Sequence, residues 1–525
     1  MKESRKISRR TFLEACSAAG VGIVLSGCSP FKTVVSDTTR RKQPNLVFVF
    51  ADQLRTQSMG YAGGPARTPY LDRFKHNSVD FSNAVSTTPV CSPFRACMLT
   101  GKYPHVNSVI ANQIRLPDEE RTFGEILSEA GYNTGYVGKW HLSGKNRIQY
   151  EPPGPGRHGF QYWSAFGFQH QNNNHYYFEN SPEPIKPDVY QMDSETDRAI
   201  GFINQQTEDK PFGLFLSWGP PHPPYAAWQM PPQYLERYGT VEEVSRSELT
   251  EQEQKQWQSW QTPVRFTPHS YDRRKNVEKE YMGGISYAAY HAMTEWVDDC
   301  FGRIVQSLEK AGLADNTIVV FTSDHGEMLG SHGLRGKMIY YDESVRIPFI
   351  VNWPEKIKPG TVSDACISTV DFLPTVLGLM GIGCPADVQG MNLAHCALGR
   401  PGAEPDGAIL ASYAGYAAFA DGWEYRGVRT KRYTYSRSLM QLRRWYGGWG
   451  PNADYSREPE IFLSDNQEDL YQQTNLAGAP EYKDIQDQLE ARVQAHLDRM
   501  GDKFLKGTEY KQFYDEENRR IKPLV

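Results

Sequence analysis

Four runs of mainly apolar residues constrain the fold of this chain more than any other feature, and each run leads into charged or polar side chains. They cover residues 44–51, 134–138, 212–217 and 317–323. Short apolar runs of this kind are typical of strands buried on both faces of a parallel sheet. Ligands of such sheets bind at the carboxyl ends of the strands. The sequence therefore predicts that the polar residues after the four runs gather at one edge of a sheet.

The segments between these runs have the spacing of amphipathic helices. Apolar side chains recur at three, four and seven residues between 287 and 308, and a shorter segment at 371–380 repeats the pattern. Alternating strands and helices predict an α/β fold in which helices cover both faces of a mostly parallel sheet. Residues 347–351 predict one further strand, which has no obvious catalytic residue at its end.

The chain has 525 residues, which is too long for one ordinary domain, and its composition becomes loop-like near residue 400. We assign residues 44–400 to the α/β domain and residues 401–525 to a smaller C-terminal subdomain. Residues 422–436 predict hairpin strands in that subdomain. A terminal helix is predicted from the helical spacing of Ile485, Leu489, Val493 and Leu497.

The first 28 residues resemble a bacterial export signal and take no part in the fold prediction. Arg9 and Arg10 match a twin-arginine signal, and the apolar stretch that follows is far shorter than the ~20 residues that cross a bilayer. Residues 25–28 match a lipoprotein cleavage box in which Cys28 is lipidated, and 29–43 form a tether. We expect the mature protein in the periplasm or cell envelope, held by a lipid anchor. The alternative is an ordinary signal peptide with an incidental cysteine.

A cysteine motif lies between the first two apolar runs. Cys91, Pro93 and Arg95 form the pattern C-x-P-x-R, and residues 99–101 add a downstream L-T-G. The motif resembles the signature of the type I, formylglycine-dependent sulfatases of the alkaline phosphatase superfamily, although Phe94 stands where members commonly have a small residue. Taken alone, the motif leaves open that Cys91 is simply a buried thiol. The other motifs, in the order expected for the family, strengthen the resemblance.

The resemblance implies an alkaline-phosphatase-like fold and a maturation enzyme that oxidises Cys91 to formylglycine, whose hydrate is the nucleophile. It also implies that one metal ion is bound by Asp52, Gln53, modified Cys91, Asp324 and His325. An oxygen-rich site of this kind favours Ca2+. The softer nitrogen of His325 leaves Mg2+ or Mn2+ open. Gln53 would bind through its amide oxygen, and the alternative is that its side chain points away from the metal.

The resemblance further assigns roles to five side chains that bind sulfate or move protons. Arg95 would lie beside the metal and the aldehyde, and Lys139 would pair with a sulfate oxygen as a point charge. Lys337 would contact the sulfate and assist the acid. His141 would hydrogen-bond the formylglycine and act as the base when sulfate is expelled. His222 would protonate the leaving oxygen of the substrate, from a loop stiffened by flanking prolines.

Two polar and aromatic segments are candidates for sugar binding. One carries His170 and His175 within residues 170–177, and the other carries Trp445 within 445–450. Both have the composition of sugar-binding rims, and the alternative is that both are ordinary surface loops. Together with the export signal, the resemblance predicts a bacterial carbohydrate sulfatase that acts on sulfated poly- or oligosaccharides.

Two other functions stay open at this point. A phosphonate monoester or phosphate diester hydrolase of the same superfamily shares formylglycine and the Asp-His metal pair. A non-catalytic protein that binds sulfated glycans would keep an unmodified Cys91. The formal charge of −5 gives no sign of a surface that binds nucleic acid.

Overall fold

The computed structural model describes residues 43–145, 150–238, 285–329, 331–415, 419–447 and 454–525. Residues Gln43–Val525 form one compact unit. The predicted export signal, with Cys28, and residues 29–42 of the tether lie outside the described residues. Gln43, the last residue of the tether, is the first residue of this unit. Among the helices that are described, none combines the length and the apolar character needed to cross a bilayer.

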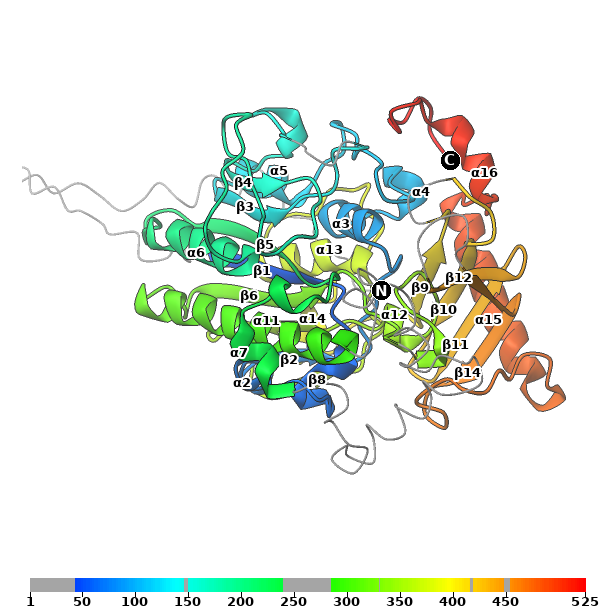
Figure 1. The fold of residues 1–525 in the computed structure, drawn as a ribbon. Coiled ribbons are helices and arrows are strands. Elements are labelled where there is room, and N and C mark those ends of the chain that lie inside the picture. Colours follow the sequence, from blue (N-terminus) through cyan, green and yellow to red (C-terminus); the bar gives the residue numbers. More distant parts are fainter. Residues whose placement is uncertain (1–42, 146–149, 239–284, 330, 416–418, 448–453) are drawn as a thin grey trace, which may run out of the picture. The chain divides into compact units, whose positions relative to one another are not determined.

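A mostly parallel sheet forms the centre of the molecule (Figure 1). Its strands are β1 (Asn45–Asp52), β2 (Val79–Phe81), β3 (Asn133–Lys139), β4 (Tyr162–Phe166), β5 (Phe212–Pro221), β6 (Thr317–Ser323), β7 (Phe349–Asn352) and β8 (Thr361–Ser363). The strands lie in the order β4-β3-β5-β1-β6-β7-β2-β8. β7 is antiparallel to both of its neighbours, and the other pairs are parallel. The α/β fold predicted from the sequence is confirmed.

The central strand β1 explains why helices cover both faces of this sheet. Its side chains alternate between the faces, so that Leu46, Phe48 and Phe50 join one hydrophobic core while Val47 and Val49 join another. The first core includes side chains of α3 (Cys91–Thr100), α5 (Phe123–Glu129) and α13 (Thr369–Met380). The second includes side chains of α2 (Pro69–His76), α6 (Gln191–Asn204) and α11 (Ile285–Lys310). The helices predicted at 287–308 and 371–380 are confirmed as α11 and α13.

Shorter helical segments connect these elements. The α-helical ones are α4 (Pro104–Asn107), α7 (Pro232–Leu235), α12 (Asp342–Val345), α14 (Ala394–Ala397) and α16 (Gly507–Tyr510). The 3-10 segments are η1 (Thr56–Ser58), η2 (Gly60–Ala62), η3 (Pro155–Arg157), η4 (Ala227–Gln229), η5 (Glu236–Tyr238), η6 (Ser331–Gly333), η7 (Pro480–Tyr482) and η8 (Lys511–Phe513).

A small antiparallel sheet follows in the C-terminal part of the chain (Figure 1). It has the order β14-β11-β10-β9, formed by β9 (Ala408–Ser412), β10 (Tyr425–Arg429), β11 (Tyr433–Ser438) and β14 (Ile461–Asp465). Apolar side chains of β10, β11 and β14 form one core with those of helix α15 (Lys483–Met500). A separate ribbon consists of β12 (Leu442–Gly447) and β13 (Asp454–Glu458). The predicted antiparallel sheet with a terminal helix is confirmed.

Two buried ion pairs connect β10 to its surroundings. Arg429 donates to both carboxylate oxygens of Asp342 on α12, at 2.8 Å each. Arg426 donates to both oxygens of Asp502, which follows α15, at 2.6 and 3.0 Å. Paired geometry of this kind compensates for the cost of removing the charges from water.

The end of the chain packs against the segment that follows α4. The hydroxyl of Tyr514 donates to the carbonyl oxygen of Ser108 at 2.5 Å. The side-chain amide of Asn518 donates to the carbonyl oxygen of Gln113 at 3.2 Å. These two residues therefore hold residues 108–113, the loop that directly follows α4.

Candidate active site

The carboxyl ends of four adjacent strands, β3, β5, β1 and β6, carry the polar residues that the sequence places there. Lys139 and Asp52 are the last residues of β3 and β1, and His222 and Asp324 directly follow β5 and β6. The ammonium of Lys139 lies 2.5 Å from Asp52 Oδ2. The structure thus brings together side chains that are far apart in the chain, as the apolar runs predicted.

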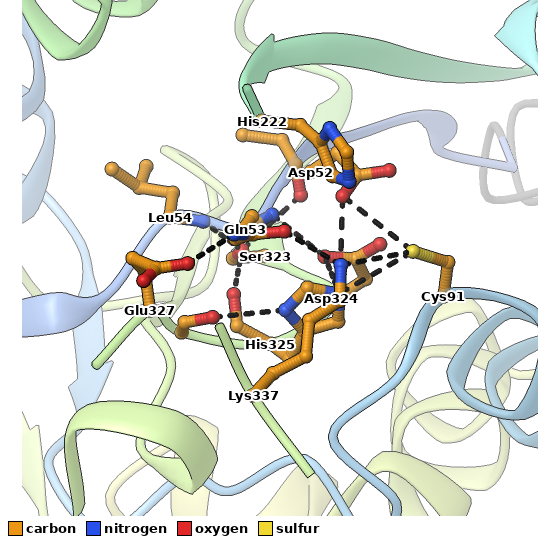
Figure 2. A network of polar contacts seen from close by, with 12 residues as sticks. Asp52, Gln53, Leu54, Cys91, His222, Ser323, Asp324, His325, Glu327 and Lys337 are labelled. Atoms are coloured by element: carbon orange, nitrogen blue, oxygen red, sulfur yellow. Dashed lines mark hydrogen bonds and ion pairs between the residues drawn. The ribbon is translucent and has the colours of Figure 1, made fainter. Parts of the chain in front are cut away.

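Cys91 is the first residue of α3, and its thiol faces this cluster (Figure 2). Its Sγ lies 3.7 Å from Asp52 Oδ1, 3.4 Å from His325 Nε2 and 3.5 Å from Lys337 Nζ. Every residue of α3 is buried, and the backbone N–H of the next residue, Ser92, donates to Asn112 in the loop beyond α4. The motif is therefore a buried helix start and not an exposed loop.

Arg95 lies one helical turn after Cys91, which places both side chains on the same side of α3. Its Nη2 lies 3.3 Å from Asp52 Oδ2 and 3.5 Å from Asp324 Oδ2. Its Nη1 donates to the carbonyl oxygen of Lys139 and to the hydroxyl of Ser217, both at 2.6 Å. The guanidinium is thereby fixed between the helix and the ends of four strands.

The pKa values of the two carboxylates of the cluster are shifted in opposite directions. Burial raises the pKa of Asp52, but the nearby cations, Lys139 foremost, hold it well below its usual value. Burial and the charge of Asp52 raise the pKa of Asp324 to about 7. A bound cation would favour the ionised form of Asp324, because opposite charge at close range stabilises a carboxylate.

Four donor groups in the cluster fit one divalent cation. Atoms of Asp52, Cys91, Asp324 and His325 lie within 4.8 Å of one another, and all four residues are buried. Ligands on opposite sides of a Ca2+ ion are about 5 Å apart, because each bond is about 2.3–2.6 Å long. The Nδ1–H of His325 donates to the carbonyl oxygen of Gly326 at 2.9 Å, which leaves Nε2 as the ligand atom. The donor set of two carboxylates, one imidazole and Cys91 suits a metal of this class.

Gln53 does not point away from the cluster. Its Oε1 accepts a hydrogen bond of 2.6 Å from the ammonium of Lys337, which also contacts Cys91. Its Nε2 donates to Glu327. The backbone of Gln53 has a φ of 70°, in the left-handed region, and such strain persists where the surrounding structure enforces it. Here the backbone N–H donates to Asp324 Oδ1 at 2.9 Å.

His141 lies close after β3 with its ring held by neighbours. Its φ of 56° is left-handed, and its carbonyl oxygen accepts a bond of 2.7 Å from the hydroxyl of Ser92. The ring stacks on Phe168 with centroids 4.4 Å apart. Neither ring nitrogen has a hydrogen-bond partner among the described residues, so both are available to a ligand. Burial, and then the charge of Lys139, hold the pKa of His141 well below its usual value.

His222 lies on the Asp52 side of the cluster, after the end of β5 (Figure 2). Its Nδ1–H donates to the carbonyl oxygen of Pro223 at 2.7 Å. Its ring stacks on that of His170, with centroids 4.0 Å apart and planes inclined by 11°. Burial, and then the charge of Lys337, lower the pKa of His222 well below its usual value. The free Nε2 is the atom that can exchange a proton with a ligand.

The three predicted sugar-binding residues have different positions. His170 lies against His222 and so belongs to the cluster itself. His175 is only 1% exposed, and burial lowers its pKa to about 4. The burial of His175 does not test its predicted role in sugar binding, which stays a prediction. Trp445 is on β12, and its side chain lies outside the described residues.

Sequence reasoning missed several residues that hold these groups in place. Ser217 was visible as the last residue of an apolar run, and Glu327 as part of the charged segment after β6. The hydroxyl of Ser92 and the ring of Phe168 had no signal of their own in the sequence. Each of the four contacts a predicted site residue.

The geometry agrees with comparisons to known proteins. The family model described as Sulfatase matches residues 44–382. The chain belongs to the sulfatase family. A second model, described as N-sulphoglucosamine sulphohydrolase, C-terminal, matches residues 330–499. The protein is therefore a sulfuric ester hydrolase, and its sheet and helices form the alkaline-phosphatase-like fold of this family.

Individual sulfatases match this one along nearly the whole chain. An ulvan-active sulfatase of Formosa agariphila is 33% identical over 513 residues, covering 96% of this sulfatase and 91% of the relative. An N-acetylglucosamine-6-O-sulfatase of Bacteroides thetaiotaomicron is 28% identical and covers 85% of each chain. A solved structure in complex with its substrate D-glucosamine-2-N,6-O-disulfate has a TM-score of 0.68 and 25% identity, covering 88% of this chain and 99% of that one.

Proposed function

We propose that this sulfatase hydrolyses sulfate esters of poly- or oligosaccharides through a formylglycine made from Cys91. The observation that carries the proposal is the position of Cys91 Sγ, buried within 3.7 Å of Asp52, His325 and Lys337. A thiol is a weak nucleophile there, because burial and then the charge of Asp52 raise its pKa. Formylglycine would supply a hydrated aldehyde as the nucleophile, which can release sulfate by reforming the aldehyde.

The relatives support a sulfated carbohydrate as the substrate class. Their names refer to ulvan and to N-acetylglucosamine, and the bound substrate in the solved structure is a sulfated glucosamine. His170 stacks on His222, the proposed acid, and this supports a contact between His170 and the leaving sugar. We therefore propose a sugar sulfate in preference to a phosphate diester.

A divalent cation would be held by Asp52, Gln53, modified Cys91, Asp324 and His325. Ca2+ suits the oxygen ligands, and the softer nitrogen of His325 leaves Mg2+ or Mn2+ open. When bound, the cation polarises a sulfate oxygen and makes a nearby hydroxyl easier to deprotonate. The span of 4.8 Å among the donor atoms supports a single ion.

The charged side chains neutralise the sulfate group. Arg95, Lys139 and Lys337 supply three positive charges against the two carboxylates Asp52 and Asp324, so the fully ionised cluster carries one excess positive charge before any metal binds. An anion entering this buried cluster is stabilised strongly, because fixed charges act with little screening away from water.

Two histidines move the protons. His222 donates from Nε2 to the leaving oxygen, since its Nδ1–H is held by the carbonyl oxygen of Pro223. His141 accepts a proton from the nucleophile at a ring nitrogen when sulfate is released, because both of its nitrogens lack a partner among the described residues. These roles place the acid and the base on separate strand ends.

Peptide mass spectrometry around Cys91 tests the proposal, in protein produced with a formylglycine-generating maturation enzyme. We expect the mass of formylglycine in active protein and no activity in Cys91→Ala. Rates on an aryl sulfate, an aryl phosphate diester and a sulfated oligosaccharide are compared in parallel. Faster turnover of the phosphate diester would favour the related hydrolase class. Binding of sulfated glycan without turnover, by protein with an intact thiol, would favour a non-catalytic binder.

The export of the protein is a separate proposal. We propose that a twin-arginine signal directs it to the periplasm or cell envelope and that a lipid on Cys28 anchors it to the membrane. Cell fractionation with labelled palmitate should place lipid on the wild-type protein and release Cys28→Ser from the membrane. If wild-type protein and Cys28→Ser fractionate equally, the proposed lipid anchor on Cys28 is wrong.

A further inference from the structure

Glu327 is a buried carboxylate beside the proposed metal cluster that has no assigned role. It is 4% exposed and follows His325 by two residues. Its Oε2 accepts a hydrogen bond from the side-chain amide of Gln53 (Figure 2). Its Oε1 accepts from the backbone N–H groups of Leu329 at 3.0 Å and Gly336 at 2.6 Å. Both oxygens are therefore directed at fixed donors of the protein.

These contacts determine the orientation of the Gln53 amide. An ionised carboxylate only accepts hydrogen bonds, so the NH2 group of Gln53 must face Glu327. The amide oxygen then faces the opposite side, where the ammonium of Lys337 donates to it at 2.6 Å. With the amide turned over, its NH2 would confront both Lys337 and a bound cation, while its oxygen would confront the carboxylate.

Hydrogen bonds also hold the backbone of Gln53. Its backbone N–H donates to Asp324 at 2.9 Å, and its carbonyl oxygen accepts from the hydroxyl of Tyr290 at 2.6 Å. The orientation of the side-chain amide depends on its own two partners, Glu327 and Lys337. Glu327 also joins the two ends of the loop that returns from residue 329 to residue 336, directly before Lys337.

We infer that Glu327 is a positioning residue that turns the amide oxygen of Gln53 toward the cation and holds the loop carrying Lys337. Glu327 itself is neither a ligand nor in contact with the substrate. The inference rests on the proposed function, because it presumes the metal that the cluster fits. It explains how an amide, which has a donor end and an acceptor end of similar shape, serves reliably as an oxygen ligand.

Glu327→Gln tests the inference with almost no change of volume. The new side chain keeps an oxygen for Leu329 and Gly336 but presents an NH2 group to Gln53. The amide of Gln53 is then expected to turn over and to direct its NH2 group at the cation. We expect the affinity for Ca2+ to fall about 10- to 100-fold, the range typical of changes next to a metal ligand. Titration calorimetry of metal-free protein with CaCl2, and separately with MgCl2 and MnCl2, measures this without relying on turnover.

The double variant Gln53→Glu, Glu327→Gln separates the effect of the orientation of side chain 53 from the effect of losing the negative charge of Glu327. In this double variant the carboxylate at position 53 accepts from the new NH2 group at position 327 and still offers an oxygen to the cation. The total charge of the pair is unchanged. We expect it to recover at least the wild-type affinity, whereas the single change does not. Glu120→Gln, which alters a buried carboxylate paired with Lys102 at 2.9 Å outside the cluster, controls for a general effect of losing a buried charge.

The outcomes distinguish this inference from the proposed function. Wild-type protein that binds none of the three metals would refute the metal site, and the positioning role with it. Wild-type binding with equal affinity in Glu327→Gln would overturn only the positioning role. A loss in Glu327→Gln that the double variant does not recover would also overturn it, because the orientation of the group at position 53 would then not be what sets the affinity. Circular dichroism and thermal melting confirm that each variant is folded before titration.

Discussion

Replacing His222 by alanine should slow the hydrolysis of sugar sulfates far more than that of an activated aryl sulfate. The ring is fixed by its stack on His170, with centroids 4.0 Å apart, and by the bond of 2.7 Å to the carbonyl oxygen of Pro223. The proton that reaches the leaving oxygen therefore comes from Nε2. A sugar alkoxide needs this proton, whereas an activated phenolate leaves without it.

The size of the effect follows from the role of a positioned acid. General acid catalysis contributes about 10²- to 10⁴-fold, which corresponds to about 2.7–5.4 kcal/mol at 1.36 kcal/mol per decade. The pKa of His222 lies well below its usual value, through burial and then the charge of Lys337, so the ring is neutral in the free enzyme at neutral pH. The rate on sugar sulfates should therefore fall as pH rises through this lowered pKa, and His222→Ala should lack that decline.

Steady-state kinetics on a sulfated oligosaccharide and on an aryl sulfate, measured in parallel across pH, check the prediction. His170→Phe keeps a ring stacked on His222 and should retain most of the activity, whereas His170→Ala should show a weaker form of the same leaving-group dependence. Equal losses on the two substrates in His222→Ala would refute the reasoning and remove His222 from the role of acid.

Three further predictions concern stability, metal and substrate. Asp502→Asn should cost roughly 3–5 kcal/mol of unfolding free energy, because it leaves Arg426 buried without its charge partner. The pKa of Asp502 is lowered to about 2, so this contribution is present above pH ~4 and is lost as pH falls toward 2, which urea unfolding measures. Removing metal with EDTA should lower the Tm, and CaCl2 at 100 times Kd should restore about 2.7 kcal/mol. His175→Leu should leave KM for a sulfated oligosaccharide unchanged, since the ring is 1% exposed, and a raised KM would instead support its predicted role in sugar binding.

The sequence predicted the central strands because their physical requirement is simple. A strand such as β1, buried on both faces, needs an unbroken apolar run. The polar residue that ends the run then lies at the carboxyl end of the strand, where the sheet meets its ligands. The strands β2 and β8, at one side of the sheet, have three residues each, too few for any periodic pattern. Their position depends on pairing with β7 and with each other, which the local sequence does not contain.

The sequence predicted the residues of the candidate site that lie at strand ends, but not those whose positions depend on loops. Residues at strand ends, such as Asp52 and Lys139, were found because the topology alone brings them together. His170 and His175 are five residues apart in one loop, yet one ring joins the cluster and the other is buried elsewhere. The part played by Glu327 depends on a loop that returns at Gly336, and no spacing in the sequence specifies that return.

The complete burial of α3 has a consequence for the timing of events in the cell. Tyr514 and Asn518 hold the loop that contacts Ser92, although they follow Ser108 and Gln113 of that loop by more than 400 residues. In the folded chain Cys91 is 0% exposed, so a second protein could reach its thiol only before α3 is buried. An enzyme that alters Cys91 would therefore have to act before α3 and this loop have packed. Because residues 514 and 518 are synthesised well after residue 91, there is an interval during synthesis in which the thiol is not yet enclosed.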